Sequence, residues 1–335
     1  MKEYLELIVR TLENRNALIL VTILASSGST PRGAGAMVLV FDDGHTEGTI
    51  GGGAVENAAR MHAAELLKSH SSDTVGYCLN KNDAANLGMI CGGNVTVYFQ
   101  YLQGEETLPL FRYMLNACSV NEDSWWIRRI EHHQVTSMAV ADSHGLHFGE
   151  DMEKTALEGL LKPQAVYQTG EPSYYAEPIT RAGFVYIFGG GHVSQELVPV
   201  LTHVGFPVIV FEDRKAFADP SLFPGARSVI LGDFQNISSS ITLQPQDYVV
   251  IMTRGHQADF EILSQVLKLP LSYIGCIGSR KKIAITRSRL TELGYPEHIM
   301  DHVHAPIGLP IKAETPAEIA ISIAGELILH RAEKL

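Results

Sequence analysis

Cysteine is scarce in this chain, and its scarcity excludes several kinds of site. Four cysteines occur among 335 residues, and no two of them form a CxxC pair. A disulfide framework and a structural zinc site both need closely spaced cysteines, so we expect neither. One iron–sulfur cluster alone usually needs about four thiolates. With four cysteines in all, the chain could therefore hold one such cluster at most.

Positive charge is also in short supply. Lysine and arginine number 26 against 37 aspartates and glutamates, which gives a formal net charge of −11. We expect no nucleic acid as a partner, because binding to phosphate backbones requires an excess of basic side chains. No apolar run approaches the roughly 20 residues of a membrane span. The first residues, Met1 to Glu6, carry acids where a signal peptide carries bases. These absences predict a cytoplasmic protein that does not enter a membrane.

The second half of the sequence contains a complete strand–turn–helix–strand unit. An apolar strand at 185–188 runs into three glycines and then a helical pattern, and a second apolar strand at 206–211 ends in two acids. This is the order of a dinucleotide-binding βαβ unit, in which a glycine turn approaches a phosphate and an acid binds a ribose hydroxyl. NAD(P) is one ligand of such units, and it stays open here. The candidate residues are Gly189, Gly190, Gly191, His192, and Glu212 or Asp213.

One residue departs from the fingerprint of that unit. Ser194 stands where the third glycine is usual, which would let the helix and the strand lie slightly farther apart.

Two more loops follow predicted strands in the same half. One comes after the strand at 248–252 and the other after the strand at 271–276. Ligands of open α/β sheets bind at the carboxyl ends of the strands, so both loops belong to the predicted site. The basic residues of the second loop have a plainer alternative, a solvated helix face. The candidates are Arg254, His256, Gly278, Ser279 and Arg280.

Two glycine-rich loops flank a predicted hairpin in the first half. The loop at 26–35 contains Arg32, and the loop at 48–53 leads into a helix with Glu56 in its first turn. Exposed backbone N–H groups beside an arginine suit an anion, whereas Glu56 would repel it. The alternative is that Glu56 simply complements the helix dipole. The candidate residues are Arg32, Gly51, Gly52, Gly53 and Glu56.

Glycines surround Cys91, so a ligand or another backbone segment could come close to it. The alternative is an inert buried thiol, which is also what we expect of the other three cysteines.

The fold class that we predict is α/β. A smaller mixed α+β domain at 1–165, whose sheet is completed by a strand pair near 125–141, precedes a linker at 166–182. A Rossmann-like parallel sheet with helices on both faces then occupies 183–335. Thr315, Pro316 and Glu318 predict a capped start for the last helix.

Taken together, these motifs resemble those of the xanthine dehydrogenase accessory family, XdhC/CoxI. The resemblance covers both ends of the chain, and the middle, about 104–172, carries little of it. The motifs are Gly28-Ser29-Thr30-Pro31-Arg32, Gly48–Gly53 with Glu56, Cys91-Gly92-Gly93, Glu177-Pro178, Phe188–Val193, Thr253–His256 with Asp259, Tyr273-Ile274-Gly275, Gly278–Lys281, Pro306–Leu309 and Glu318–Ala320.

The resemblance implies a chaperone that binds molybdenum cofactor (a molybdopterin of unknown variant) and delivers it to a molybdenum hydroxylase such as xanthine dehydrogenase, in purine catabolism. It implies Cys91 as a molybdenum contact and the Rossmann half as a holder of the cofactor's phosphate or nucleotide portion. The implied partners are the hydroxylase and proteins of cofactor biosynthesis or sulfuration.

Two other functions stay open beside this maturation role. One is an NAD(P)-dependent oxidoreductase or the nucleotide-binding subunit of a xanthine dehydrogenase. The other is an adaptor that only docks the target enzyme. Whether the protein is an enzyme, which hydroxylase it serves and whether it forms a homo-oligomer are not decided by the sequence.

Overall fold

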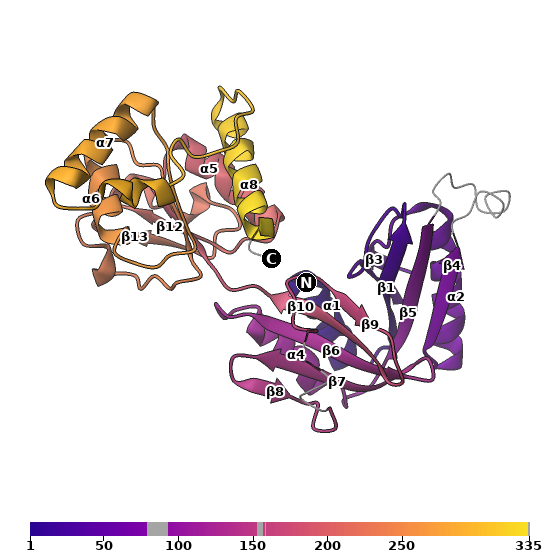
Figure 1. Cartoon of the computed structure of the whole chain (residues 1–335). Coiled ribbons are helices and arrows are strands. Elements are labelled where there is room, and N and C mark those ends of the chain that lie inside the picture. Colours follow the sequence, from indigo (N-terminus) through magenta and orange to yellow (C-terminus); the bar gives the residue numbers. More distant parts are fainter. Residues whose placement is uncertain (79–92, 153–156, 158, 334–335) are drawn as a thin grey trace. The chain divides into compact units, whose positions relative to one another are not determined.

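The computed structural model of the chain describes residues 1–78, 93–152, 157 and 159–333, without the side chains of Arg280 and Glu297. It contains two compact units, Met1–Arg181 and Ala182–Leu335 (Figure 1). The first unit is the larger of the two, whereas the sequence predicted a smaller N-terminal domain.

The described residues of the first unit form three α-helices and ten strands. The helices are α1 (Lys2–Glu13), α2 (Gly53–Ser69) and α4 (Leu108–Ala117). The strands are β1 (Leu18–Gly28), β2 (Met37–Phe41), β3 (Thr46–Gly48), β4 (Asp73–Cys78), β5 (Gly93–Leu102), β6 (Ser124–Glu131), β7 (Gln134–Asp142), β8 (Gly145–His147), β9 (Val166–Gln168) and β10 (Ser173–Thr180).

The first sheet of this unit is antiparallel, with the strand order β3-β2-β1-β5-β4. Its central strand, β1, is buried on both faces, which explains its continuous apolar run. Ile19 and Val21 pack with α2, while Leu18 and Leu20 pack with α1 and α4 on the opposite face. Both glycine-rich loops therefore begin at strands of a well-packed sheet, the first at the end of β1 and the second at the end of β3.

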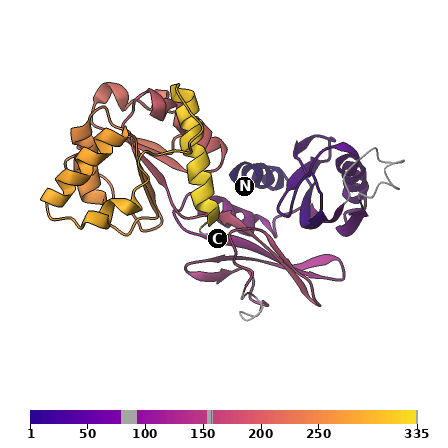
Figure 2. The same ribbon diagram turned by 45° about the horizontal axis from the view of Figure 1, so that its top comes forward.

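The second sheet of this unit has the order β8-β7-β6-β10-β9. Two expectations were wrong here. The strand pair near 125–141 does not complete the first sheet, because β6 pairs with β7 and β10 instead. The segment 166–182 is no linker, since β9 and β10 lie in this sheet and Tyr175 and Ala176 are fully buried. Figure 2 shows the two sheets of the unit as separate layers.

A buried arginine joins the two sheets of the first unit. Arg128 of β6 is 0% exposed and donates from Nη2 to Glu177 Oε1 at 2.7 Å. Its guanidinium also donates to Thr22 of β1 at 3.2 Å and lies over the Trp126 and Tyr175 rings. A buried charge is tolerated only when it is paired and hydrogen-bonded, and here the partners come from both layers.

The second unit is a doubly wound α/β domain. Its strands are β11 (Val185–Phe188), β12 (Val208–Glu212), β13 (Ser228–Leu231), β14 (Tyr248–Ile251) and β15 (Tyr273–Cys276). Its helices are α5 (His192–His203), α6 (His256–Val266), α7 (Arg280–Glu292) and α8 (Pro316–Glu333).

All five strands are parallel, in the order β13-β12-β11-β14-β15, which is the Rossmann order with its switch point between β11 and β14. The predicted Rossmann-like sheet is confirmed. Helices α5 and α8 cover one face, with α8 in yellow, and α6 and α7 cover the other (Figure 1). The predicted capping box also forms: Glu318 N–H donates to Thr315 Oγ1, and Thr315 N–H donates to the Glu318 carboxylate.

None of the helices in the described part of the chain combines the length and apolarity that a membrane span requires.

Candidate functional site

The glycine turn after β11 is held in place by its own helix. Gly189 has φ 109° and lies so close to the end of β14 that a Cβ would be 2.5 Å from the Met252 carbonyl oxygen. The Ser194 hydroxyl donates to the Gly189 carbonyl, and Gln195 Nε2 donates to the Gly190 carbonyl at 3.1 Å. Ser194, which replaces the third glycine of the fingerprint, thus connects the helix to the turn through a hydrogen bond that it donates.

Glu212 ends β12 directly opposite this turn, and its carboxylate is already saturated. It accepts from Gly190 N–H at 2.5 Å, from the backbone N–H groups of Asp213 and Arg214, and from Nε and Nη2 of the Arg214 side chain. Those five donors exceed the roughly four lone-pair sites of a carboxylate. Although burial opposes ionisation, the hydrogen bonds from Arg214 hold the pKa of Glu212 at about 2.

Of the two acids that the sequence offered for a ribose hydroxyl, Asp213 is the accessible one. Its side chain is 36% exposed, compared with 1% for Glu212. Burial and the adjacent Glu212 carboxylate raise the pKa of Asp213, while Arg254 and Arg214 act in the opposite direction. Asp213 at the end of β12 and Arg254 in the loop after β14 therefore interact electrostatically.

A basic cavity of about 390 Å³ lies between the first turns of α6 and α7. It brings together three predicted residues, Arg254, His256 and Ser279. Gly255 and Ser279 are the N-caps of the two helices, and Ser279 Oγ accepts from Lys282 N–H at 3.3 Å. Gly278 immediately precedes Ser279, and the side chain of Arg280 lies outside the described part. The cavity is lined by Arg254, Gly255, His256, Ser279, Lys281, Lys282 and Ile285.

A buried acid beside this cavity belongs to one of the motifs of the resemblance but was not among the predicted site residues. Asp259 is 1% exposed and accepts from the Thr253 hydroxyl at 2.5 Å and from Lys282 Nζ at 2.6 Å. The signal that could have found it is its helical spacing from the apolar residues Ile262, Leu263 and Val266, because an acid on a buried stripe needs a partner. Lys282, 23 positions later, supplies it.

The two glycine-rich loops of the first unit do meet. A Cβ on Gly51, whose φ is 128°, would be 2.8 Å from Pro31 Cβ and 3.5 Å from Arg32 Cγ. Arg32 is exposed, and it forms no hydrogen bond or ion pair with any other residue that the structure describes. The predicted Arg32 and Gly51–Gly53 cluster is therefore one surface.

Glu56 lies in the first turn of α2, as expected, and its carboxylate has a further role in the loop before that helix. Its Oε2 atom accepts from the Thr49 hydroxyl and from the backbone N–H groups of Ile50 and Gly52, both at 3.0 Å. Partial burial opposes its ionisation, but these hydrogen bonds lower the pKa of Glu56. The loop thus binds a carboxylate of its own chain where an external anion was expected.

The cysteines differ from the prediction in one case. Cys276 is buried, and this burial raises the pKa of its thiol to about 12, whereas Cys78 at the end of β4 is exposed rather than part of a core. Cys91 lies outside the described residues. Gly93, the next described residue along the chain, packs against the first glycine-rich loop, where its Cβ would be 2.5 Å from the Ser27 carbonyl oxygen.

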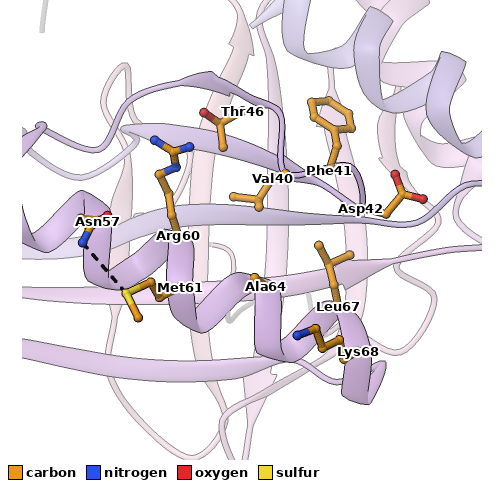
Figure 3. Close-up of a pocket in the computed structure, with 11 residues that line it drawn as sticks. Val40, Phe41, Asp42, Thr46, Asn57, Arg60, Met61, Ala64, Leu67 and Lys68 are labelled. Carbon is orange, nitrogen blue, oxygen red and sulfur yellow. Dashed lines mark hydrogen bonds between the residues drawn. The ribbon is translucent and has the colours of Figure 1, made fainter.

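A hollow of the first unit, of about 480 Å³, was not foreseen from the sequence. Figure 3 shows Arg60 and Leu67 of α2 extending toward the hairpin of β2 and β3, while Asn57 and Met61 point toward each other. Its lining combines apolar residues with the basic Arg60 and Lys68 and the acidic Asp42, and does not include Glu56. Among the described residues, no group of three or more histidine, cysteine or acidic side chains could hold a metal ion.

Two family models match the chain. The XdhC Rossmann domain matches residues 185–327, and the XdhC and CoxI family model matches residues 11–77.

The chain belongs to the XdhC and CoxI family.

Relatives of known name extend the likeness over almost the whole chain. A probable xanthine dehydrogenase subunit of Bacillus subtilis is 28% identical over 329 residues, covering 96% of this chain and 95% of that protein. The molybdenum cofactor insertion chaperone PaoD of Escherichia coli is 21% identical, over 97% of this chain and 88% of its own. A solved structure described as a xanthine dehydrogenase from Bacillus halodurans is 27% identical with a TM-score of 0.84, covering 100% of this chain and 96% of that one.

Proposed function

We propose that this XdhC-family protein is an accessory factor of a molybdenum hydroxylase, which binds molybdenum cofactor and delivers it to that enzyme. The observation that carries the proposal is the likeness over 97% of the chain to a molybdenum cofactor insertion chaperone. Its partners are then the hydroxylase, of the xanthine dehydrogenase kind, and the proteins that make or sulfurate the cofactor.

The chemistry of both units is compatible with this cargo. A pterin phosphate needs hydrogen-bond donors, a local cation and, for the metal, a soft sulfur ligand. In the first unit we assign this role to Arg32, to the Gly51–Gly53 loop and to Cys91 as the molybdenum contact. In the second unit we assign it to the carboxyl edge of the sheet, where Arg254, His256 and Ser279 line the basic cavity.

An NAD(P)-linked dehydrogenase is the second candidate, since two relatives carry the name xanthine dehydrogenase. Two observations count against it. Of the two acids that could bind a ribose hydroxyl, Glu212 is saturated by Arg214 and by backbone donors, which leaves Asp213 alone for that role. Four cysteines also cannot hold the two iron–sulfur clusters of a complete enzyme, which together need about eight thiolates.

The test begins with protein purified from cells that make the cofactor. We expect it to carry molybdenum and pterin fluorescence, and to raise the activity of a cofactor-poor molybdenum hydroxylase. The isolated protein should not reduce NAD with xanthine. Steady xanthine-dependent NADH formation by the isolated chain would replace the accessory role with the dehydrogenase.

A pair of cysteine variants tests the assigned molybdenum contact. Cys91→Ser should lower the molybdenum content, while Cys78→Ser, an exposed cysteine of the same unit, should retain it. Equal molybdenum content in both variants would remove Cys91 from the site. Docking to the hydroxylase without any bound cofactor would instead favour a plain adaptor.

A further inference from the structure

The glycine turn of the Rossmann unit is poorly suited to bind a phosphate. One of its N–H donors, that of Gly190, is bound to the buried Glu212 carboxylate. The loop after β12 also covers this residue, because a Cβ on Gly190 would be 2.4 Å from the Phe217 carbonyl oxygen. An incoming anion at Gly190 would find this donor occupied by the Glu212 carboxylate and would meet the Phe217 carbonyl oxygen at short range.

The cavity between α6 and α7 has the opposite character. Arg254 and Lys281 are exposed, and neither forms a salt bridge with any residue in the described part of the chain. Lys282 adds a third positive charge, which the buried Asp259 neutralises. The lining therefore keeps an excess of about two positive charges in a protein whose net charge is −11.

The geometry of the cavity suits a compact anion with several oxygen atoms. Its lining combines a guanidinium, an ammonium and the first turns of two helices of 11 and 13 residues. Such first turns direct backbone N–H groups outward, and the positive end of the helix dipole favours negative charge. His256 adds a ring nitrogen, and the floor is fixed by the contacts of Asp259 with Thr253 and Lys282.

We propose that this cavity, rather than the glycine turn, binds the terminal phosphate of a phosphomonoester ligand. Arg254 and Lys281 provide the direct charge contacts. Asp259 acts as a positioning residue by holding Lys282 and the loop after β14. The phosphomonoester can come from a phosphorylated pterin or from a nucleotide, which present the same dianionic end to the cavity.

The experiment measures binding to the full chain by isothermal titration calorimetry in a low-salt buffer free of phosphate. The probes are 5′-AMP, adenosine, inorganic phosphate and the phosphate ester of 6-hydroxymethylpterin. We expect binding of both phosphate esters, competition by inorganic phosphate and no binding of adenosine. Tighter binding of the pterin ester identifies a pterin as the source, and tighter binding of AMP identifies a nucleotide.

Four variants locate the phosphate. Lys281→Gln and Arg254→Gln should each weaken phosphate-ester binding about tenfold, as expected for the loss of a charged hydrogen bond. Lys268→Gln is the matched control, since Lys268 is exposed just beyond the opposite end of α6. Gly191→Val should bind as the natural chain does, because Gly191 has φ −73° and nothing lies within 4 Å of an added Cβ.

The results that would overturn the proposal are equally specific. Loss of binding in Gly191→Val with full binding in Lys281→Gln would show that the glycine turn, and not the cavity, binds the phosphate. Equal affinity for AMP and adenosine, or no binding of any phosphate probe at millimolar concentration, would show that the cavity is not a phosphate site. The inference depends on the second unit alone, so the molybdenum-loading assay reports separately on the accessory role.

Discussion

Each unit contains a glycine-rich turn that binds a carboxylate of the chain itself. In the first unit Glu56 accepts from the N–H groups of Ile50 and Gly52. In the second unit Glu212 accepts from the N–H of Gly190. Both turns precede a helix, and the sequence pattern predicts an external anion at each of them.

The two carboxylates differ in burial and in partner. Glu212 is buried and receives two hydrogen bonds from the Arg214 side chain, so its charge is neutralised locally. Glu56 is half-buried, and its hydrogen-bond donors among the described residues are a hydroxyl and backbone groups, not a cation. The turn of the second unit is therefore a closed structural element, whereas we expect that of the first unit, beside Arg32, to exchange its carboxylate for a stronger anion.

The largest expected effect is that of Glu212→Gln. The pKa of Glu212 lies at about 2 instead of its ordinary 4.5, a difference worth about 3 kcal/mol of the free energy of unfolding at neutral pH. Because the folded-state pKa is depressed, this stabilisation is complete above about pH 5 and is lost as the pH falls toward 2. The variant should be less stable at pH 7 and lack this acid-dependent loss.

Denaturant unfolding followed by two probes measures this effect. Both tryptophans, Trp125 and Trp126, lie in β6, so their emission reports the first unit, while far-UV circular dichroism reports both units. The circular dichroism transition should shift and the tryptophan transition should not. Glu196→Gln, at an exposed position of α5, is the control. Unchanged stability of the Glu212 variant would show that the carboxylate is free to bind a ligand.

The second prediction compares adjacent glycines of the closed turn. Gly190→Ala should destabilise the second unit by about 2 kcal/mol, because its Cβ would collide with the Phe217 carbonyl and approach the Phe223 ring. Gly191→Ala should change the stability by less than about 0.5 kcal/mol, since its Cβ meets open space. Thermal melts of the two variants check this, and equal melting temperatures would contradict the covered geometry of Gly190.

Much of the fold was predictable from local patterns. The strand, glycine turn and helix at 185–203 follow from period and turn chemistry, as does the capping box at Thr315. Contacts between distant positions were not predictable in the same way. The sequence around Arg128 gives no sign that this residue is buried and pairs with Glu177, 49 positions later. The strands at 166–180 were assigned to a linker because Pro172 and Pro178 obscure their alternation.

For the candidate site, too, local patterns were predictable and contacts between distant positions were not. Sequence patterns identified the loops at the strand ends, and the structure brings Arg254, His256 and Ser279 around one cavity. The pattern could not say which donors were already used, because Glu212 and Glu56 compete with any ligand for the same N–H groups. Hydrogen-bond competition is a property of the folded loop, not of residue spacing.

The third prediction concerns the open turn. Glu56→Gln should lower the stability of the first unit by about 1 kcal/mol, because an amide oxygen is a weaker acceptor for the same donors than a carboxylate. The pKa of Glu56 is lowered on folding, so the natural chain should lose this difference as the pH falls below the ordinary glutamate pKa of 4.5. Tryptophan emission during denaturant unfolding checks it, with Glu65→Gln, an exposed position of the same helix, as the control. A loss as large as that of Glu212→Gln would show that the two turns are equally closed.

The smallest stability effect is that of Arg32→Gln, and it tests the open turn most directly. Arg32 is exposed and contributes no hydrogen bond or ion pair within the described part of the first unit, so the free energy of unfolding should change by less than about 0.5 kcal/mol. If an external anion takes the place of Glu56, the arginine stabilises that anion, and its loss should reduce molybdenum retention several-fold. Arg10→Gln, an exposed arginine of α1, controls for the change in net charge. Full retention in Arg32→Gln would mean that the glycine-rich surface of the first unit is as closed to anions as the turn that holds Glu212.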